Sequence, residues 1–335
     1  MRPRTYALGL AAMVFGCFGA VAGANLYLDP EGVLGINVSP LAPNDRYLRF
    51  MDYRADPDAY NALLFGSSRS LAIPIGTLSR YLAGARVANF AVVGGTITDH
   101  WPIIEYVTRT RAGHANPVRN VLLVLDIDLF GTTGTNLNIQ MMLAPEITGE
   151  PPWRFKWRYL TAIQPEAWST AYRRALPRAA AQPIATRAGE AATARAFPAF
   201  IGAANAQARA LPPVPTPGEP LVDPTVRADF ARQLDMLRKF VDLCRNNRIN
   251  LVVALSPLRT DVAATLDAAA AAEVVRRIAA IVPVWDFGHP QWLSDTPRVW
   301  ADPSHYTAEV GGLMLDRIYG RAPLAQHPDF GELRD

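Results

Sequence analysis

Two short segments carry residue types that could act together as a nucleophile and a base. Gly66-Ser67-Ser68-Arg69 places two hydroxyls directly after a glycine, and Asp302-Pro303-Ser304-His305 places a carboxylate three residues before an imidazole. A serine hydroxyl becomes a good nucleophile when an adjacent base takes its proton, and a carboxylate fixes the tautomer of a histidine base. The two segments therefore predict a triad of Ser68, His305 and Asp302.

Each motif also has a purely structural interpretation. Serine is favoured where helices begin, so Gly-Ser-Ser is typical of an ordinary turn before a helix. An isolated Asp-x-x-His is more often a surface turn than half of a catalytic pair. His305 has an acid at this spacing just ahead of a helix that contains two glycines, whereas the other four histidines lack this arrangement and are expected to be structural.

An alternation of apolar runs and helical patterns must position these segments. The runs read as buried strands and cover residues 62–65, 85–93, 120–125, 250–255 and 281–285. Helices are expected over 74–82, 98–109, 229–246, 262–280 and 307–319. This order predicts an α/β fold, a doubly wound three-layer sandwich around a mainly parallel five-stranded sheet, with ligands bound at the carboxyl ends of the strands. Polar residues that follow three of these runs are expected to line that cleft, namely Ser67, Arg69, Asp126, Asp128 and Ser256.

The amino terminus predicts an extracytoplasmic location. Residues 5–28 carry no charge, and the 19 residues from Tyr6 to Ala24 would span about 28 Å as a helix, close to the hydrocarbon thickness of a bilayer. Arg2 and Arg4 precede this segment, and acidic residues follow it, so residues 1–28 are expected to be a signal anchor with the remainder outside the cytoplasm. The Arg- and Ala-rich composition indicates a bacterial inner membrane and periplasm.

Two alternatives to an uncleaved anchor stay open. Ala22-Gly23-Ala24 fits a signal-peptidase site, and Val14-Phe15-Gly16-Cys17 faintly resembles a lipoprotein signal. All three interpretations place the rest of the chain outside the cytoplasm.

Composition limits the remaining choices. The chain has 335 residues, a formal net charge of +3 and two cysteines, so neither nucleic-acid binding nor a disulfide framework is expected. No cofactor or metal is expected, because Asp99, Asp126 and Asp128 have no His or Cys at ligand spacing.

We expect one α/β domain over 29–325, interrupted by a mainly helical insertion at about 132–220, and a tail over 326–335. Residues 153–159 of the insertion alternate aromatic and basic side chains, which favours an amphipathic helix packed on the domain, with contact to membrane headgroups or glycan as the alternative.

Taken in order, these motifs resemble the SGNH (GDSL-type) hydrolase superfamily. Gly66-Ser67-Ser68 resembles its first block, the stretch from Asn89 to Thr96 its second, and Asp302 with His305 its fifth. The resemblance implies Ser68 as nucleophile and an oxyanion hole formed by the backbone of Ser68 and of Gly94 or Gly95. The similarity is greatest to a membrane-anchored branch that includes D-alanyl-transfer proteins of teichoic acid and acetyltransferase-like proteins of alginate.

The third block departs from this pattern. Its usual asparagine donates to the oxyanion, but the corresponding strand end here carries Asp126 and Asp128, and an ionised carboxylate cannot donate. Losing one such donor typically reduces the rate by about 10²–10³. Either another donor replaces it, such as Arg69 or an N–H near Ser68, or activity is low, or the fold only binds.

Two functions follow as expectations. One is a serine esterase or O-acyltransferase acting on acyl esters of a cell-envelope or exported polysaccharide, with the inner membrane and a membrane-bound acyltransferase as partners. The other is a catalytically silent glycan-binding or scaffold protein of a polysaccharide export or modification machine.

Overall fold

The computed structural model describes residues 3–36, 44–111, 113–132, 142–165, 168–169, 221–320, 324–325 and 327–335. The chain divides into two compact units. One comprises residues 1–52 and 135–196, and the other comprises residues 53–134 and 197–335. Most of the expected insertion, residues 170–220, lies outside the described residues.

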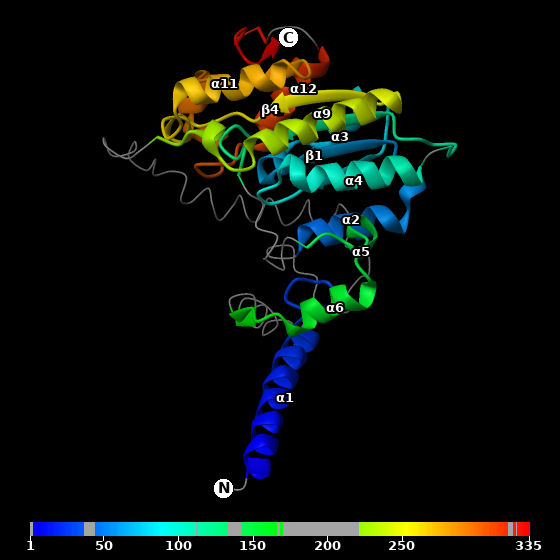
Figure 1. Cartoon of the computed structure of the whole chain (residues 1–335). Helices are drawn as coiled ribbons and strands as arrows, with labels where there is room; N and C mark the ends of the chain where they lie inside the picture. Colours follow the sequence, from blue (N-terminus) through cyan, green and yellow to red (C-terminus); the bar gives the residue numbers. More distant parts are fainter. Residues whose placement is uncertain are drawn as a thin grey trace. The chain divides into compact units, whose positions relative to one another are not determined.

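The second unit is built on a mixed, mostly parallel six-stranded sheet (Figure 1). The strands lie in the order β2-β1-β3-β4-β5-β6, and all neighbouring pairs are parallel except β5 with β6. Their bounds are β1 Ala62–Gly66, β2 Val87–Ala91, β3 Asn120–Leu125, β4 Asn250–Leu255, β5 Val284–Asp286 and β6 Glu332–Arg334. The prediction of five strands was therefore one short, because the expected tail supplies the antiparallel edge strand β6.

Helices cover both faces of this sheet. The core on one face joins α3 (Ile75–Tyr81) and α12 (Ala308–Gly320) to alternate strand residues such as Leu64 and Leu122. On the other face, Phe65 of β1 meets Phe240 of α9 edge to face, at 5.7 Å between ring centroids. Helix α9 (Phe230–Asn246) packs beside α4 (Ile97–Thr110). Short 3-10 helices complete the unit: η1 Pro57–Ala59, η2 Ser68–Ala72, η5 Pro224–Val226, η6 Trp292–Asp295 and η7 Pro297–Val299.

Two helix boundaries differ from the sequence-based expectation. The single helix expected over 262–280 is two, α10 (Thr260–Ala263) and α11 (Ala268–Ala279), because Leu266 forms a bridge with Val222 and Asp267 caps the second helix. The expected helix start at Thr98 lies earlier, since the Asp99 carboxylate accepts from the Thr96 N–H at 2.9 Å in a capping box.

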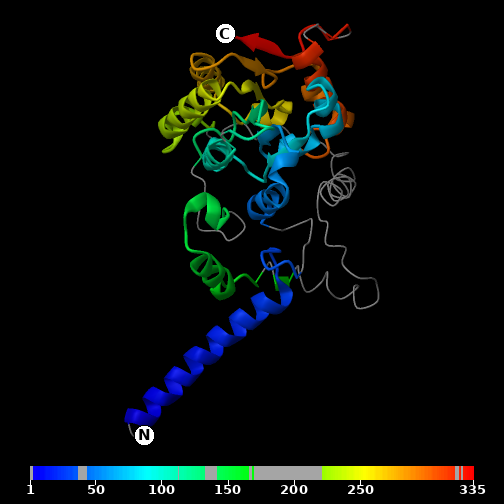
Figure 2. The same ribbon diagram turned by 90° about the vertical axis from the view of Figure 1, so that its right-hand side faces the viewer.

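The first unit contains the long apolar helix α1 (Pro3–Leu28), together with α5 (Pro145–Thr148) and α6 (Pro152–Thr161). Helix α2 (Asp45–Ala55) runs across the division between the units. A small core of Val33, Met142, Phe155 and Tyr159 joins the chain after α1 to α6. Residues 5–20 of α1 are exposed, and the stretch Thr5–Leu28 has a mean hydropathy of 2.0, so this helix could be a signal anchor or a signal sequence (Figure 2).

Candidate active site

Ser68 begins a short helix directly after the first strand. Strand β1 ends at Gly66, and the Ser67 hydroxyl oxygen then accepts from the Arg69 N–H at 3.1 Å and caps η2. Only glycine fits at position 66, because a Cβ there would lie 2.7 Å from the Cβ of Ser70 and 3.1 Å from the Val124 carbonyl oxygen. The tight turn brings Ser68 to the carboxyl end of the sheet, with its side chain partly exposed.

A closed loop presents the histidine. Trp300 and Tyr306 pair across its base and are both buried, and the Ala301 N–H donates to the His305 carbonyl oxygen at 2.7 Å. Within the loop, Asp302 Oδ1 accepts from the backbone N–H groups of Ser304 and His305, at 2.7 and 2.9 Å. These bonds fix the Asp302 carboxylate independently of its contact with the imidazole.

The structure brings the three predicted side chains into one hydrogen-bonded chain. The Nδ1 atom of His305 lies 2.7 Å from Asp302 Oδ2, and its Nε2 atom lies 2.8 Å from Ser68 Oγ. Burial opposes ionisation of Asp302, but the hydrogen bonds from His305 and from the loop backbone outweigh it and lower the pKa of Asp302. An ionised Asp302 accepts from the Nδ1–H and leaves Nε2 free to accept the Ser68 proton.

Arg69, the residue after the nucleophile position, ties three segments together. Its Nε donates to the Ser304 carbonyl oxygen at 2.8 Å, and its two Nη atoms donate to the two carboxylate oxygens of Asp128, the Nη2 bond being 2.7 Å long. Asp126 Oδ1 lies 3.4 Å from Nη1. Burial alone would lower the pKa of the guanidinium, but the two carboxylates raise it instead, so Arg69 is a permanently charged link.

This arrangement changes the interpretation of the third block. Sequence reasoning offered Arg69 as a substitute oxyanion donor. In the structure, three of its five N–H groups donate to Ser304 and Asp128, and Asp126 lies within ion-pair distance. Where the resemblance led us to expect an asparagine, the chain after β3 thus carries two carboxylate partners of a buried cation. Nothing local in the sequence joins Arg69 to a residue 59 positions away, so this link was missed.

The glycine pair after β2 lies against the turn that carries Ser68. A Cβ on Gly95 would lie 2.6 Å from the Gly66 carbonyl oxygen, so the two turns are in direct contact. Gly94 has a φ of +60° and is exposed. Among the described residues, the backbone N–H groups of Ser68 and Gly94 donate to no other group of the chain. These are the two N–H groups that the resemblance implies as oxyanion donors.

The other predicted cleft residues lie deeper than expected. Ser67, Arg69, Asp126 and Ser256 are buried, and only Asp128 keeps partial exposure. They were expected to line the cleft because each follows a strand end, and Asp128 is the one among them that reaches the surface.

A glycine of α12, which sequence reasoning singled out only as part of a pair, positions the nucleophile segment. A Cβ on Gly311 would lie 2.5 Å from the Ala72 carbonyl oxygen, the last residue of η2, whereas Gly312 has open space around it.

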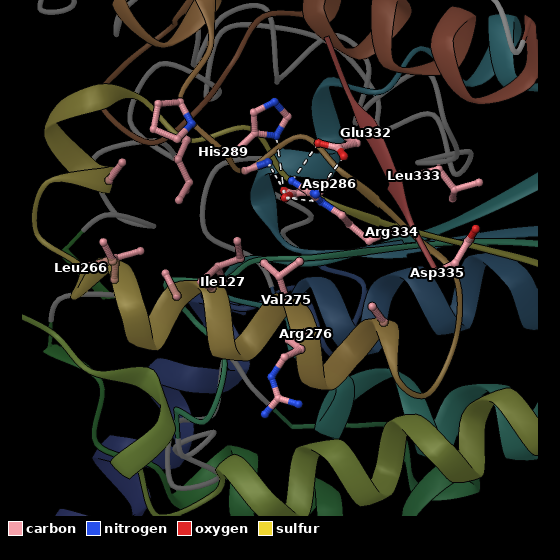
Figure 3. Close-up of a pocket in the computed structure, with 18 residues that line it drawn as sticks. Ile127, Leu266, Val275, Arg276, Asp286, His289, Glu332, Leu333, Arg334 and Asp335 are labelled. Carbon is pink, nitrogen blue, oxygen red and sulfur yellow. Dashed lines mark hydrogen bonds and ion pairs between the residues drawn. The ribbon is translucent and has the colours of Figure 1, made fainter. Parts of the chain in front are cut away.

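A cavity lies elsewhere in the same unit. It measures about 680 Å³ and lies between α11, the end of β5 and β6, with Asp286, His289 and Arg334 on one wall (Figure 3). None of the three triad residues lines it. No group of three metal-ligating side chains occurs among the described residues.

Comparisons with known proteins leave the family open. The chain matches no protein-family model and no curated protein sequence. The interpretation of the site therefore depends on its geometry.

Proposed function

We propose that this chain is an extracytoplasmic serine esterase or O-acyltransferase of the SGNH type. The observation that carries the proposal is the contact of 2.8 Å between Ser68 Oγ and His305 Nε2, with Asp302 on the far side of the imidazole. Ser68 and His305 are 237 residues apart, so this contact is a product of the tertiary fold. A nucleophile, a base and a group that orients the base are the parts that acyl transfer requires.

The first half-reaction transfers an acyl group to the enzyme. His305 Nε2 takes the hydroxyl proton as Ser68 Oγ attacks the carbonyl carbon of an ester. The backbone N–H groups of Ser68 and Gly94 donate to the oxyanion of the tetrahedral intermediate. The intermediate collapses to a Ser68 ester, and His305 returns the proton to the departing alkoxide.

The second half-reaction decides between the two activities. His305 takes a proton from the acceptor, whose oxygen attacks the Ser68 ester. As the serine leaves, His305 returns the proton to Ser68 Oγ. Water as acceptor gives an esterase, and a sugar hydroxyl gives an O-acyltransferase.

Location and resemblance supply the substrate class. An apolar helix near the amino terminus supports a signal anchor in a bacterial inner membrane, with the α/β unit in the periplasm. The strand order, with helices on both faces, supports a doubly wound SGNH-like architecture. The substrates are then acyl esters of a cell-envelope or exported polysaccharide, and the partner is a membrane-bound acyltransferase.

A fluorophosphonate probe tests the catalytic proposal, because it reacts only with an activated serine. The wild-type chain should be labelled and Ser68→Ala should not, while Ser79→Ala, on α3 and outside the site, should label like wild type. A folded wild-type protein that takes no label would overturn the proposal.

One observation favours the second candidate, a silent scaffold. The third block provides a cation clamp instead of an amide donor, so the site has fewer oxyanion donors than the resemblance implies. A scaffold would take no label, and Ser68→Ala would support polysaccharide modification in cells as well as wild type does.

A further inference from the structure

Helix α6 is fixed to the end of the apolar helix α1 by a buried asparagine. The side-chain amide of Asn25, in the last turn of α1, donates to the carbonyl oxygens of Tyr159, Leu160 and Ala162 at 3.1, 2.9 and 2.8 Å. Carbonyls at the end of a helix have no partner within the helix, so Asn25 caps α6. The two helices lie side by side at this point in both views (Figures 1 and 2).

The chain that follows α1 adds a second attachment. The Tyr159 hydroxyl donates to Asp29 Oδ1 at 2.7 Å and accepts from the Glu31 N–H at 3.3 Å. These groups are buried, and breaking their hydrogen bonds would leave polar atoms without water. Separating α6 from the end of α1 would therefore be energetically unfavourable.

The two faces of α6 differ sharply. Phe155 and Tyr159 are buried in the core of the first unit, whereas Trp153 and Trp157 are 71% and 61% exposed. At about 100° per residue, the two tryptophans share a face opposite the buried one.

Basic and apolar side chains continue this surface. Arg154, Lys156 and Arg158 are exposed beside the tryptophans. Glu150 pairs with Arg158 at 2.6 Å and with Arg154 at 3.6 Å, so the cluster keeps a net positive charge. Neighbouring segments also carry exposed apolar side chains, namely Leu26 and Tyr27 of α1 and Ile163 after α6.

We propose that α6 is an interfacial helix lying on the outer surface of the bilayer that α1 enters. Trp153 and Trp157 then occupy the boundary between headgroups and acyl chains, and the three basic residues meet lipid phosphates. Tryptophan and basic residues are typical of this boundary. The occupant is lipid and not a protein partner, because α6 is hydrogen-bonded to the last turn of the helix that itself enters the bilayer. The inference rests on the membrane anchor of the proposed function and is independent of its chemistry.

Depth-dependent quenching tests the inference on the full chain. The protein is reconstituted in phosphatidylethanolamine and phosphatidylglycerol vesicles whose acyl chains carry bromine near the headgroup, and is compared with the Trp153→Phe/Trp157→Phe variant. The two residues are two of seven tryptophans, so shallow bromine should remove up to about two sevenths more emission from the wild type than from the variant. Bromine at the ends of the acyl chains should quench the emission of Trp153 and Trp157 less.

Each other outcome has a defined meaning. Equal quenching of wild type and variant by shallow bromine, in protein that floats with the vesicles, would overturn the interfacial helix and leave the anchor intact. Failure to float would overturn both. A blue shift of the same tryptophan component on adding cellohexaose, without bromine quenching, would overturn the lipid assignment in favour of a glycan surface. Fluorophosphonate labelling of the same samples reports separately on the proposed chemistry.

Discussion

Arg69→Met should both destabilise the α/β unit and misplace its histidine loop. The side chains of Arg69, Asp126 and Asp128 are 5%, 1% and 16% exposed, so the substitution leaves two carboxylates without their cation in a largely dry environment. Removing one partner of a buried ion pair typically destabilises a protein by about 3–5 kcal/mol. Because Asp128 retains some contact with water, we expect about 3 kcal/mol, which lowers the Tm by about 6–12 °C in a unit of this size.

Labelling by fluorophosphonate supplies the functional measurement. The substitution also removes the donor to the Ser304 carbonyl, which holds the loop beside His305. A displacement of about 1 Å in a catalytic group can reduce rates on the order of 10²-fold, so labelling per folded molecule should fall by about tenfold or more. Labelling of Arg69→Lys should lie between that of the wild type and that of Arg69→Met, because lysine cannot bond both oxygens of Asp128 and the Ser304 carbonyl together.

Arg259→Met is the matched control. Arg259 is equally buried and pairs with Asp261, but Arg259 is the N-cap residue of α10 and Asp261 lies in its first turn, and neither touches the triad. This variant should lose stability and keep its labelling. Unchanged Tm in Arg69→Met would refute the reasoning about the buried pair, and unchanged labelling per folded molecule would refute the positioning role.

Two further substitutions probe other parts of the site. Gly311→Ala should destabilise the protein by about 1–3 kcal/mol in thermal unfolding, because the new Cβ would meet backbone atoms at the end of η2. Gly312→Ala, its control, should be neutral or stabilising by up to about 1 kcal/mol, and equal effects of the two substitutions would contradict this packing. Asp302→Asn should reduce fluorophosphonate labelling by about 10⁴-fold because the imidazole tautomer is no longer fixed. Since the folded-state pKa of Asp302 is lowered, its stabilisation is present above about pH 4 and disappears as the pH falls through that lowered value. The Tm difference between Asp302→Asn and wild type should therefore shrink on acidification, and a constant difference would contradict this assignment.

Continuous apolar patterns made the central strands predictable. The runs 120–125 and 250–255 match β3 and β4 residue for residue, because both strands are covered by helices on two faces and contain few polar residues. Strand β6 could not be found in the same way. It has three residues, two of them charged, and it is recognised as a strand by its pairing with β5 and not by an apolar pattern.

Local chemistry predicted the histidine loop but not the link beneath it. Asp302 and His305 are close in the chain, so their spacing alone made the contact plausible. The interaction of Arg69 with Asp128 depends on the neighbouring positions of β1 and β3 in the sheet, which no short motif encodes. The split at Leu266 had a local signal, since Asp267 ahead of an alanine run is a typical helix cap.

The Arg69 link also bears on how the site opens in the native state. Its guanidinium holds the nucleophile segment, the end of β3 and the histidine loop at once, so releasing any one of them leaves a buried charge or a buried N–H group without its partner. Local fluctuations of the histidine loop alone are therefore suppressed, and the three segments form one cooperative opening unit. The amide hydrogens of Ser304 and His305 should then exchange with solvent as slowly as those of β3, although they belong to a surface loop.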